Sequence, residues 1–399
     1  MQLILLLFTL AFIFDYAEVL GEQSLSVHSM GYSDSDDISI WEGFVLYKKD
    51  LSDSTNLSIQ YGIDSVTSAS FNAISETTPS VQSASLRSST IQEATLQIRD
   101  DDEDENEEHD DDHDENNENT SQALAKLRHS ASISMEHNYT NEISGVTSIQ
   151  GSSKSDYVSY TLGQTISMPI LDNLTTFGLG AYYTQNTNTP HIPTTNLDLL
   201  PPQGESLNSN QMTSILSIER IISNKSRIKV LAEAYNQTGY LSTGYQRVPI
   251  ENGTLSGDAL EVLPNERTGV ALTAIYSQWL LKNSAGHIRA RYAKDSYGMI
   301  GLSGDLTLLT YLSDAIIGEI RYRYYHQTSA DFYGQSFNSL PSGFFSNHRS
   351  LSEFTAYMIG GALTFDIGSW GSANVSADLY QTDKGLSFGT VSLGFTHLF

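Results

Sequence analysis

The sequence contains no cysteine among its 399 residues. Disulfide bridges are therefore absent, and the chain is not one of the small secreted scaffolds that depend on them. Long apolar runs are missing too: no segment after the first 14 residues approaches the roughly 18 to 20 apolar residues of a membrane-spanning helix. These absences exclude a disulfide-stapled domain and a helical membrane protein.

Basic residues are few, with 21 Lys and Arg against 47 Asp and Glu, and the formal net charge is −26. No basic patch stands out that could neutralise phosphates, so we expect no nucleic-acid partner. The sequence also has no glycine-rich phosphate loop, no nucleotide motif and no Cys/His metal signature. We therefore expect no cofactor and no bound metal.

The first 14 residues, MQLILLLFTLAFIF, have the length of a signal-peptide core and are too short to anchor the chain in a bilayer. Small residues at the −3 and −1 positions, Val19 and Gly21, predict cleavage after Gly21. No Lys or Arg precedes the core, which leaves a buried N-terminal strand or helix as the alternative. Export is favoured, because nothing amphipathic follows for such a helix to pack with. We therefore expect a signal peptide at 1–21 and a single mature domain at 22–399.

What the sequence does have is alternation of apolar and polar residues with a period of two, which is typical of strands with one lipid-facing and one polar face. In the last strand Val391, Leu393, Phe395 and Phe399 share one parity, and mainly Thr, Ser and Gly occupy the other. Similar alternation recurs at 158–168, 176–183, 300–308, 316–325 and 373–380. These runs exceed the roughly 5–6 residues usual in a soluble sandwich and approach the roughly 9–11 that a bilayer requires.

Short turns alternate with longer polar connections along the chain. Turns are predicted at Asp172–Asn173, Ser223–Lys225, Lys282–Ser284, Ser313–Asp314 and Gly368–Gly371, and long connections near 185–209, 239–266 and 330–352. Periplasmic turns and extracellular loops produce this pattern in outer-membrane barrels. With Phe399 at the periplasmic rim, counting backwards predicts an all-β fold, a closed antiparallel transmembrane β-barrel of 16 strands whose first strand lies near Leu25–Met30. Fourteen strands is the alternative, if the first two lie outside the wall.

An acidic run dominates the net charge, since fourteen of the 47 acids lie between Asp100 and Glu118. The run has no apolar residue to bury and its charges repel one another, so we expect a disordered extracellular loop at about 99–120. With His109 and His113 it could bind divalent cations, but it lacks the spaced Asp and central Gly of a Ca²⁺-binding loop. Disorder is the stronger prediction.

Charged residues gather on one parity of three C-terminal strands. A charged side chain on the lipid face would cost roughly 2–4 kcal/mol near the bilayer midplane, so these residues are predicted to face the lumen. The predicted cluster consists of Arg227, Lys229, Glu233, His287, Arg289, Arg291, Glu319, Arg321 and Arg323. It could form a constriction that selects anions, or a lattice of Arg–Glu pairs that fills and stiffens the barrel. Both interpretations stay open, and we expect a partly compensated, net-positive wall.

Catalysis has little support in the sequence. A hydrolase needs a nucleophile beside a His that has its own orienting partner, and no spacing specifies such a set. His326 falls on the outward parity of its strand, and His348 lies in a loop beside Arg349 and Ser350. We therefore expect that the protein is not an enzyme.

Distinctive stretches occur along the chain from about Leu25 to Phe399. They are GYSDSDDISIWEGFVLYKK near the start, QYGIDSVTSAS at 60–70, SSKSDYVSYTLG at 152–163, GYLSTGYQRV at 239–248, LPNERTG at 263–269, IRARY at 288–292, IRYRYYHQTSADFY at 320–333 and SNHRSLSEFTAY at 346–357. Together they resemble a family of bacterial outer-membrane β-barrel proteins known only as a domain of unknown function. The sequence departs from the family pattern at the acidic insertion and at Asp295–Gly298.

The resemblance implies an outer-membrane barrel of unknown activity whose terminal Phe399 is read as a signal by the barrel-assembly machinery. We expect that machinery, outer-membrane lipid and lipopolysaccharide as partners, while the oligomeric state is left open. The leading interpretation is a pore or transport barrel for small polar solutes in the bacterial outer membrane. The alternative is a structural or surface-interaction barrel with a plugged lumen, whose loops bind ligands or partners.

Overall fold

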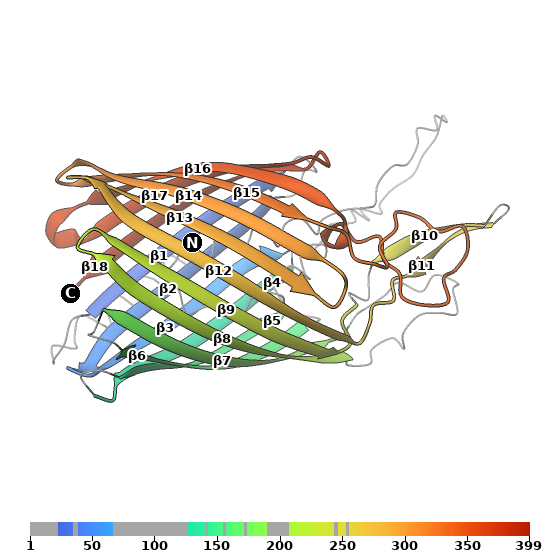
Figure 1. Cartoon of the computed structure of the whole chain (residues 1–399), viewed down its shortest axis with the longest axis horizontal. Coiled ribbons are helices and arrows are strands. Elements are labelled where there is room, and N and C mark those ends of the chain that lie inside the picture. Colours follow the sequence, from blue (N-terminus) through green and yellow to red (C-terminus); the bar gives the residue numbers. More distant parts are fainter. Residues whose placement is uncertain are drawn as a thin grey trace, which may run out of the picture.

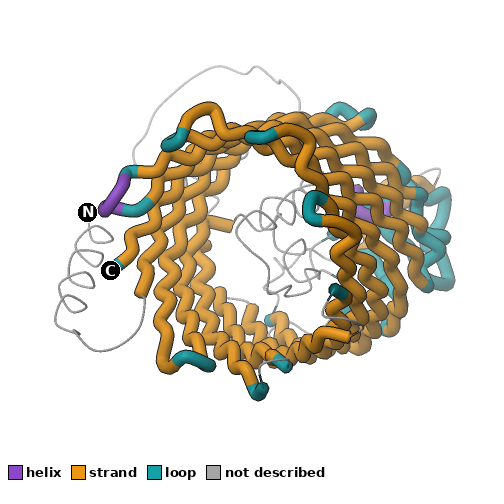
Figure 2. The backbone as a smooth tube through the Cα atoms, turned by 60° about the vertical axis from the view of Figure 1, so that its left-hand side comes forward, coloured by secondary structure: helices purple, strands orange, loops and turns teal. Residues whose placement is uncertain are grey.

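Sixteen antiparallel strands form a closed barrel (Figures 1 and 2). The computed structural model describes residues 23–34, 39–66, 126–140, 143–154, 157–170, 174–189, 207–242, 246–252 and 255–399. The wall consists of β1 (Gln23–Asp34), β2 (Ser39–Ser52), β3 (Thr55–Val66), β4 (Lys126–Asn138), β5 (Ser144–Lys154), β6 (Tyr157–Ile170), β7 (Thr175–Asn188), β8 (Leu207–Ser223), β9 (Ser226–Gly239), β12 (Glu266–Leu281), β13 (Ser284–Asp295), β14 (Ile300–Ser313), β15 (Ile316–Gln327), β16 (Phe354–Asp366), β17 (Ser372–Thr382) and β18 (Ser387–Leu398). Outside the wall lie a hairpin and two short 3₁₀ helices, namely β10 (Arg247–Asn252), β11 (Leu255–Leu260), Arg349–Leu351 and Gly368–Trp370.

The barrel closes where its first strand pairs with its last. Val27 of β1 lies opposite Phe395 of β18, and the backbone N–H of Phe399 donates to the carbonyl of Gln23 at 3.0 Å. Closure leaves none of the sixteen strands with a free edge, as a sheet in lipid requires. The predicted count of 16 and the position of the first strand are confirmed.

The two ends of the barrel differ. At the end where Gln23 and Phe399 meet, called the turn end, short turns join the strands: β8 ends at Ser223 and β9 begins at Ser226, for example. Four of the five predicted turns are confirmed, and the fifth, at Asp172–Asn173, lies outside the described residues. The opposite end, called the loop end, carries the long connections 189–206, 240–265 and 328–353, in agreement with the prediction. The connection 67–125 lies at this end too and is the longest of all. The remaining loop-end connections, such as 155–156 and 296–299, are short, so the alternation of lengths is incomplete.

The outer surface is apolar, because one parity of each strand carries large hydrophobic side chains that remain exposed. Residues predicted to face lipid do so, among them Leu302, Leu306, Ile320, Leu379 and Leu393. Exposed aromatic side chains lie toward both ends of the strands, as interfacial girdles require. Those near the turn end include Trp279, Tyr311 and Trp370, and those toward the loop end include Trp41, Tyr160 and Tyr183. The exterior is therefore that of an outer-membrane barrel.

In the described part of the chain, no helix is long and apolar enough to cross a membrane. Two predictions, the signal peptide at 1–21 and the acidic loop at 99–120, lie outside the described residues.

Side chains on the inner face pack across the closure. The rings of Tyr380 and Phe388 stack with their centroids 4.4 Å apart, and Tyr32 of β1 lies 5.0 Å from Phe388. Phe354 and Met358 of β16 belong to the same buried cluster. If the pairing of β1 with β18 shifted by one residue, Tyr32 or Phe388 would turn from the lumen toward the lipid. The buried cluster therefore fixes the register of β1 against β18.

Candidate functional site

A ladder of charged side chains crosses the inner wall from β8 to β17. We call it the charged ladder; it consists of the nine predicted residues together with Glu219, Asp305 and Asp378. Two of its ion pairs skip a strand: Arg321 of β15 reaches Asp378 of β17 at 3.0 Å, and Arg291 of β13 reaches Glu233 of β9 at 3.3 Å. Contacts that skip a strand form on the concave face of a barrel, which places these residues in the lumen.

The remaining ion pairs of the ladder join neighbouring residues or strands. Glu219 accepts from Arg227 at 3.1 Å and lies 3.8 Å from the Lys229 ammonium. Glu319 lies 3.5 Å from Arg321. The guanidinium of Arg323 donates to Asp305 directly across the β14–β15 pair. Most of the ladder is thus a lattice of compensated pairs, which was one of the two open interpretations.

Arg289 is the exception in this lattice. It lies opposite Asp305 in the β13–β14 register, but Asp305 is already bound by Arg323. Among the described residues Arg289 makes no ion pair and no hydrogen bond through its side chain. One cation of the ladder therefore remains without a counter-charge in contact.

Three acids of the ladder escaped the sequence reasoning: Glu219, Asp305 and Asp378. Asp305 and Asp378 lie on the polar parity of their strands, so the alternation already indicated that they face the lumen. Their partners depend on the register between strands, and no local pattern specifies that register.

A glycine opens the path for the ion pair between β15 and β17. Gly360 of β16 lies opposite Arg321 on one side and Asp378 on the other. A Cβ at this position would overlap Asp378 Oδ1 and lie 2.7 Å from its Cγ. Asp378 is only 3% exposed, so it occupies the space that a side chain on β16 would fill.

The wall halfway round the ring from β13–β15 is uncharged in its middle. There β3, β4 and β5 place Gln60, Ser132 and Gln150 in one cross-strand row. Charge returns only toward the strand ends, where Arg128 donates to Asp64 at 2.6 Å near the loop end. The lumen thus has a charged wall facing a wall of hydroxyl and amide groups.

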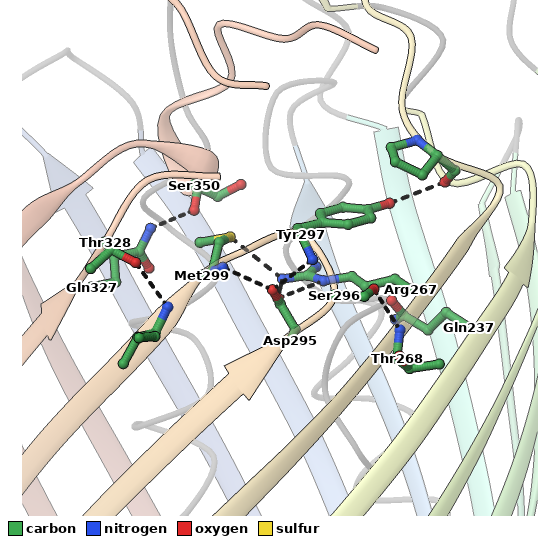
Figure 3. A network of polar contacts seen from close by, with 12 residues as sticks. Gln237, Arg267, Thr268, Asp295, Ser296, Tyr297, Met299, Gln327, Thr328 and Ser350 are labelled. Carbon is green, nitrogen blue, oxygen red and sulfur yellow. Dashed lines mark hydrogen bonds and ion pairs between the residues drawn. The ribbon is translucent and has the colours of Figure 1, made fainter. Parts of the chain in front are cut away.

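A second polar centre lies at the loop end (Figure 3). Arg267 of β12 binds Asp295 Oδ2 through Nε at 3.0 Å and Nη2 at 2.6 Å. The other carboxylate oxygen accepts from the backbone N–H groups of Tyr297 and Met299 at 3.0 and 3.1 Å. The Arg267 guanidinium also lies 4.7 Å from the Tyr297 ring centroid. Asp295 thereby fixes the connection between β13 and β14 to β12.

The described loop-end connections pack together into one body, which we call the loop cap: residues 240–242, 246–252, 255–265, 296–299 and 328–353. Hairpin β10–β11 projects beyond the wall (Figure 1), and Val248 packs with Phe345 and Phe337. Val262 pairs with Phe345 in an isolated bridge. The stretches at 239–248, 263–269, 320–333 and 346–357 that carried the family resemblance all run into this cap.

Buried polar groups hold the cap together. Ser346, fully buried, donates to Glu261 Oε2 at 2.7 Å, and Gln246 donates to Asn347 at 2.8 Å. Burial, reinforced by the charge of Glu261, raises the pKa of Tyr240 to about 12. In the described residues the cap thus combines hydrogen-bonded polar groups with two apolar clusters, one around Tyr297 and one around Val248.

Acid is expected to loosen the loop cap through His348. Burial lowers the pKa of this imidazole from 6.5 to about 4, because desolvation disfavours the charged ring. Between these values the unfolded segment binds a proton that the folded one does not, so stability is complete above pH 6.5 and falls as the pH drops. The loss reaches roughly 2 kcal/mol by pH 5.

Limited proteolysis of the 328–353 connection at pH 7 and pH 5 measures this effect. His348→Gln, which cannot titrate in this range, should show cleavage rates that barely differ between the two pH values. Equal pH sensitivity in both proteins would assign the acid response to another group.

The described residues give little support for metal binding or catalysis. They hold no group of three His, Asp or Glu side chains that could bind a metal ion. His287 Nδ1 lies 2.7 Å from Ser277 Oγ, a pairing that the sequence did not indicate. No carboxylate of the described chain hydrogen-bonds to His287 Nε2, so this pair lacks the orienting group of a catalytic triad. His326, predicted on the outward parity, bonds to Thr355 at 3.1 Å.

Comparison with known proteins gives a matching family and several solved structures to which the chain is similar. The family model described as "Protein of unknown function (DUF3570)" matches residues 15–393. No curated protein sequence matches the chain. Among solved structures, the outer membrane protein OpdK from Pseudomonas aeruginosa is similar, at 6% identity and a TM-score of 0.43, over 95% of this chain and 99% of that one. A mutant ferric enterobactin receptor, PfeA, from the same organism is 11% identical with a TM-score of 0.44, over 91% of this chain and 54% of that one.

Proposed function

Because the chain belongs to the DUF3570 family of proteins of unknown function, we propose a function from its own geometry: it is a pore or transport barrel that passes small polar solutes across the outer membrane. The single observation that carries the proposal is the charged ladder on the inner face. Charged side chains within a membrane-spanning wall are stable only beside counter-charges and water. A lumen lined in this way is hydrated, and water is the medium in which polar solutes move.

The opposite wall supports the same proposal. Its middle carries Gln60, Ser132 and Gln150, whose uncharged polar side chains can offer hydrogen bonds to a passing solute. A barrel filled by its own core would instead pack large side chains from both walls against each other.

Purified protein refolded into planar bilayers is expected to give stable conductance steps. Arg323→Ala should change the size of the step, because it removes a charge from the lumen and frees Asp305 from its partner. Lys282→Ala, in the exposed turn between β12 and β13, should leave the step unchanged. Silence across voltages for protein that migrates as a folded barrel would overturn the proposal.

A second candidate function rests on the loop cap. A body held outside the membrane by buried polar pairs and apolar clusters is suited to contact a ligand or another protein. On this proposal the barrel is a support whose lumen is closed and whose loops do the binding. A folded barrel that conducts no ions favours this second candidate.

The partners expected from the sequence are proposed on the outer surface. The apolar exterior fits outer-membrane lipid and lipopolysaccharide acyl chains. Phe399 lies exposed at the turn end, where a terminal aromatic would be accessible to the barrel-assembly machinery.

A further inference from the structure

The charges of the ladder do not balance. Its carboxylates are Glu219, Glu233, Asp305, Glu319 and Asp378, and each one is in an ion pair. Its permanent cations are Arg227, Lys229, Arg289, Arg291, Arg321 and Arg323. Six cations against five carboxylates leave one positive charge in excess, and Arg289 is the cation without a partner.

Arg289 lies where its excess positive charge can act on solutes inside the barrel. The residue lies in the middle of β13, away from the turns and from the loop cap. It stands between His287 and Arg291 on its own strand and faces Asp305, which Arg323 already neutralises. Across the lumen the middle of β3–β5 carries no carboxylate in the described chain that could offset it.

We infer that the lumen selects small anions and that Arg289 is the residue that sets this selectivity. The inference rests on the proposed pore function and names its substrate class. An anion in the middle of the barrel meets, on one wall, a guanidinium that no carboxylate binds in contact, with hydroxyl and amide donors on the other wall, at Ser132 and Gln150. A cation meets the same guanidinium and only carboxylates that are already paired.

The inference is tested by reversal potentials across planar bilayers with a KCl gradient, and again with potassium phosphate. The native protein should favour the anion over K⁺. For an ion that passes within about 5 Å, removing one positive charge lowers the occupancy of an anion, and raises that of a cation, by roughly two- to fourfold each in salt water. Arg289→Gln should therefore lower the anion-to-cation permeability ratio by roughly four- to sixteenfold. Because Arg289 makes no ion pair or side-chain hydrogen bond in the described structure, its replacement breaks no such contact.

Two further variants test whether the permeability ratio changes in the direction that the charges predict. Asp305→Asn removes the carboxylate that neutralises Arg323, so it should raise the permeability ratio for chloride. Lys282→Gln removes a charge at the turn end and should leave the ratio unchanged. A conducting pore that prefers K⁺, or one that Arg289→Gln and Asp305→Asn shift in the same direction, overturns the inference while the pore function stands. Absence of any conductance overturns the pore function itself.

Discussion

Replacing Gly360 by alanine is expected to destabilise the barrel by about 3 kcal/mol, as breaking a buried ion pair does. The new methyl group would overlap Asp378 Oδ1, and the carboxylate would have to leave its position. Arg321 would then lose the acceptor that it holds at 3.0 Å. Asp378 would remain buried without a counter-charge, which is the costly outcome for a charged group away from water.

The measurement is the temperature at which the folded, fast-migrating band is lost on a detergent gel. Gly304→Ala is the matched control, because a Cβ at Gly304 of β14 meets nothing within 4 Å. Adding Asp378→Ala to Gly360→Ala removes the overlap and the stranded charge together, so the double variant should recover part of the loss. Equal melting of the Gly360 and Gly304 variants would show that the ion pair adds no stability.

Replacing Asp295 by alanine is expected to release the connection between β13 and β14, at a cost of about 3 kcal/mol or more. Its carboxylate accepts two bonds from Arg267 and two from backbone N–H groups. Its removal takes from Arg267, whose side chain is 12% exposed, the carboxylate oxygen that accepts from both Nε and Nη2. The contact between Asp295 and Arg267 joins the loop cap to the wall. We therefore expect residues 328–353 to loosen as well when Asp295 is replaced.

Limited proteolysis reports this change as faster cleavage within the loop cap, while the wall stays protected. Asp314→Ala, in the exposed turn between β14 and β15, is the control and should match the native protein. If the Asp295 variant resists protease as well as the control does, the cap is held by its apolar clusters instead of this ion pair.

Much of the wall could be predicted from the sequence, because the information is local. Lipid-facing residues such as Leu379 and Leu393 are distinguished from lumen residues by parity alone. Turns at Ser223–Lys225 and Lys282–Ser284 interrupt that alternation and reveal where strands end. The count of sixteen strands follows from these two signals.

The ladder could be predicted only in part. Parity placed Arg321 in the lumen, but its main partner, Asp378, lies two strands and 57 residues away. That pairing depends on register and on Gly360, a residue that no charge pattern singles out. The excess charge on Arg289 is likewise visible only once every other cation has been assigned its carboxylate.

The loop cap was beyond local reasoning. Hairpin β10–β11 contains Pro249 and follows a polar segment that includes Gly239 and Gly244, so its sequence is typical of a loop. Its structure comes from packing against 328–353, which lies far along the chain: Ile250 of β10 pairs with Phe337. Long-range packing of this kind leaves no periodic signature.

The closure between β1 and β18 also sets the order of events in folding. Ser26 and Thr396 lie 2.9 Å apart across it, although 370 residues separate them in the chain. Bringing together the ends of so long a segment costs about 5 kcal/mol of chain entropy, and non-local pairing of this kind slows folding. The first strand to be synthesised, β1, can therefore pair with β18 only after the last strand has been made. A chain that stops before β18 retains two open sheet edges, which have a strong tendency to aggregate.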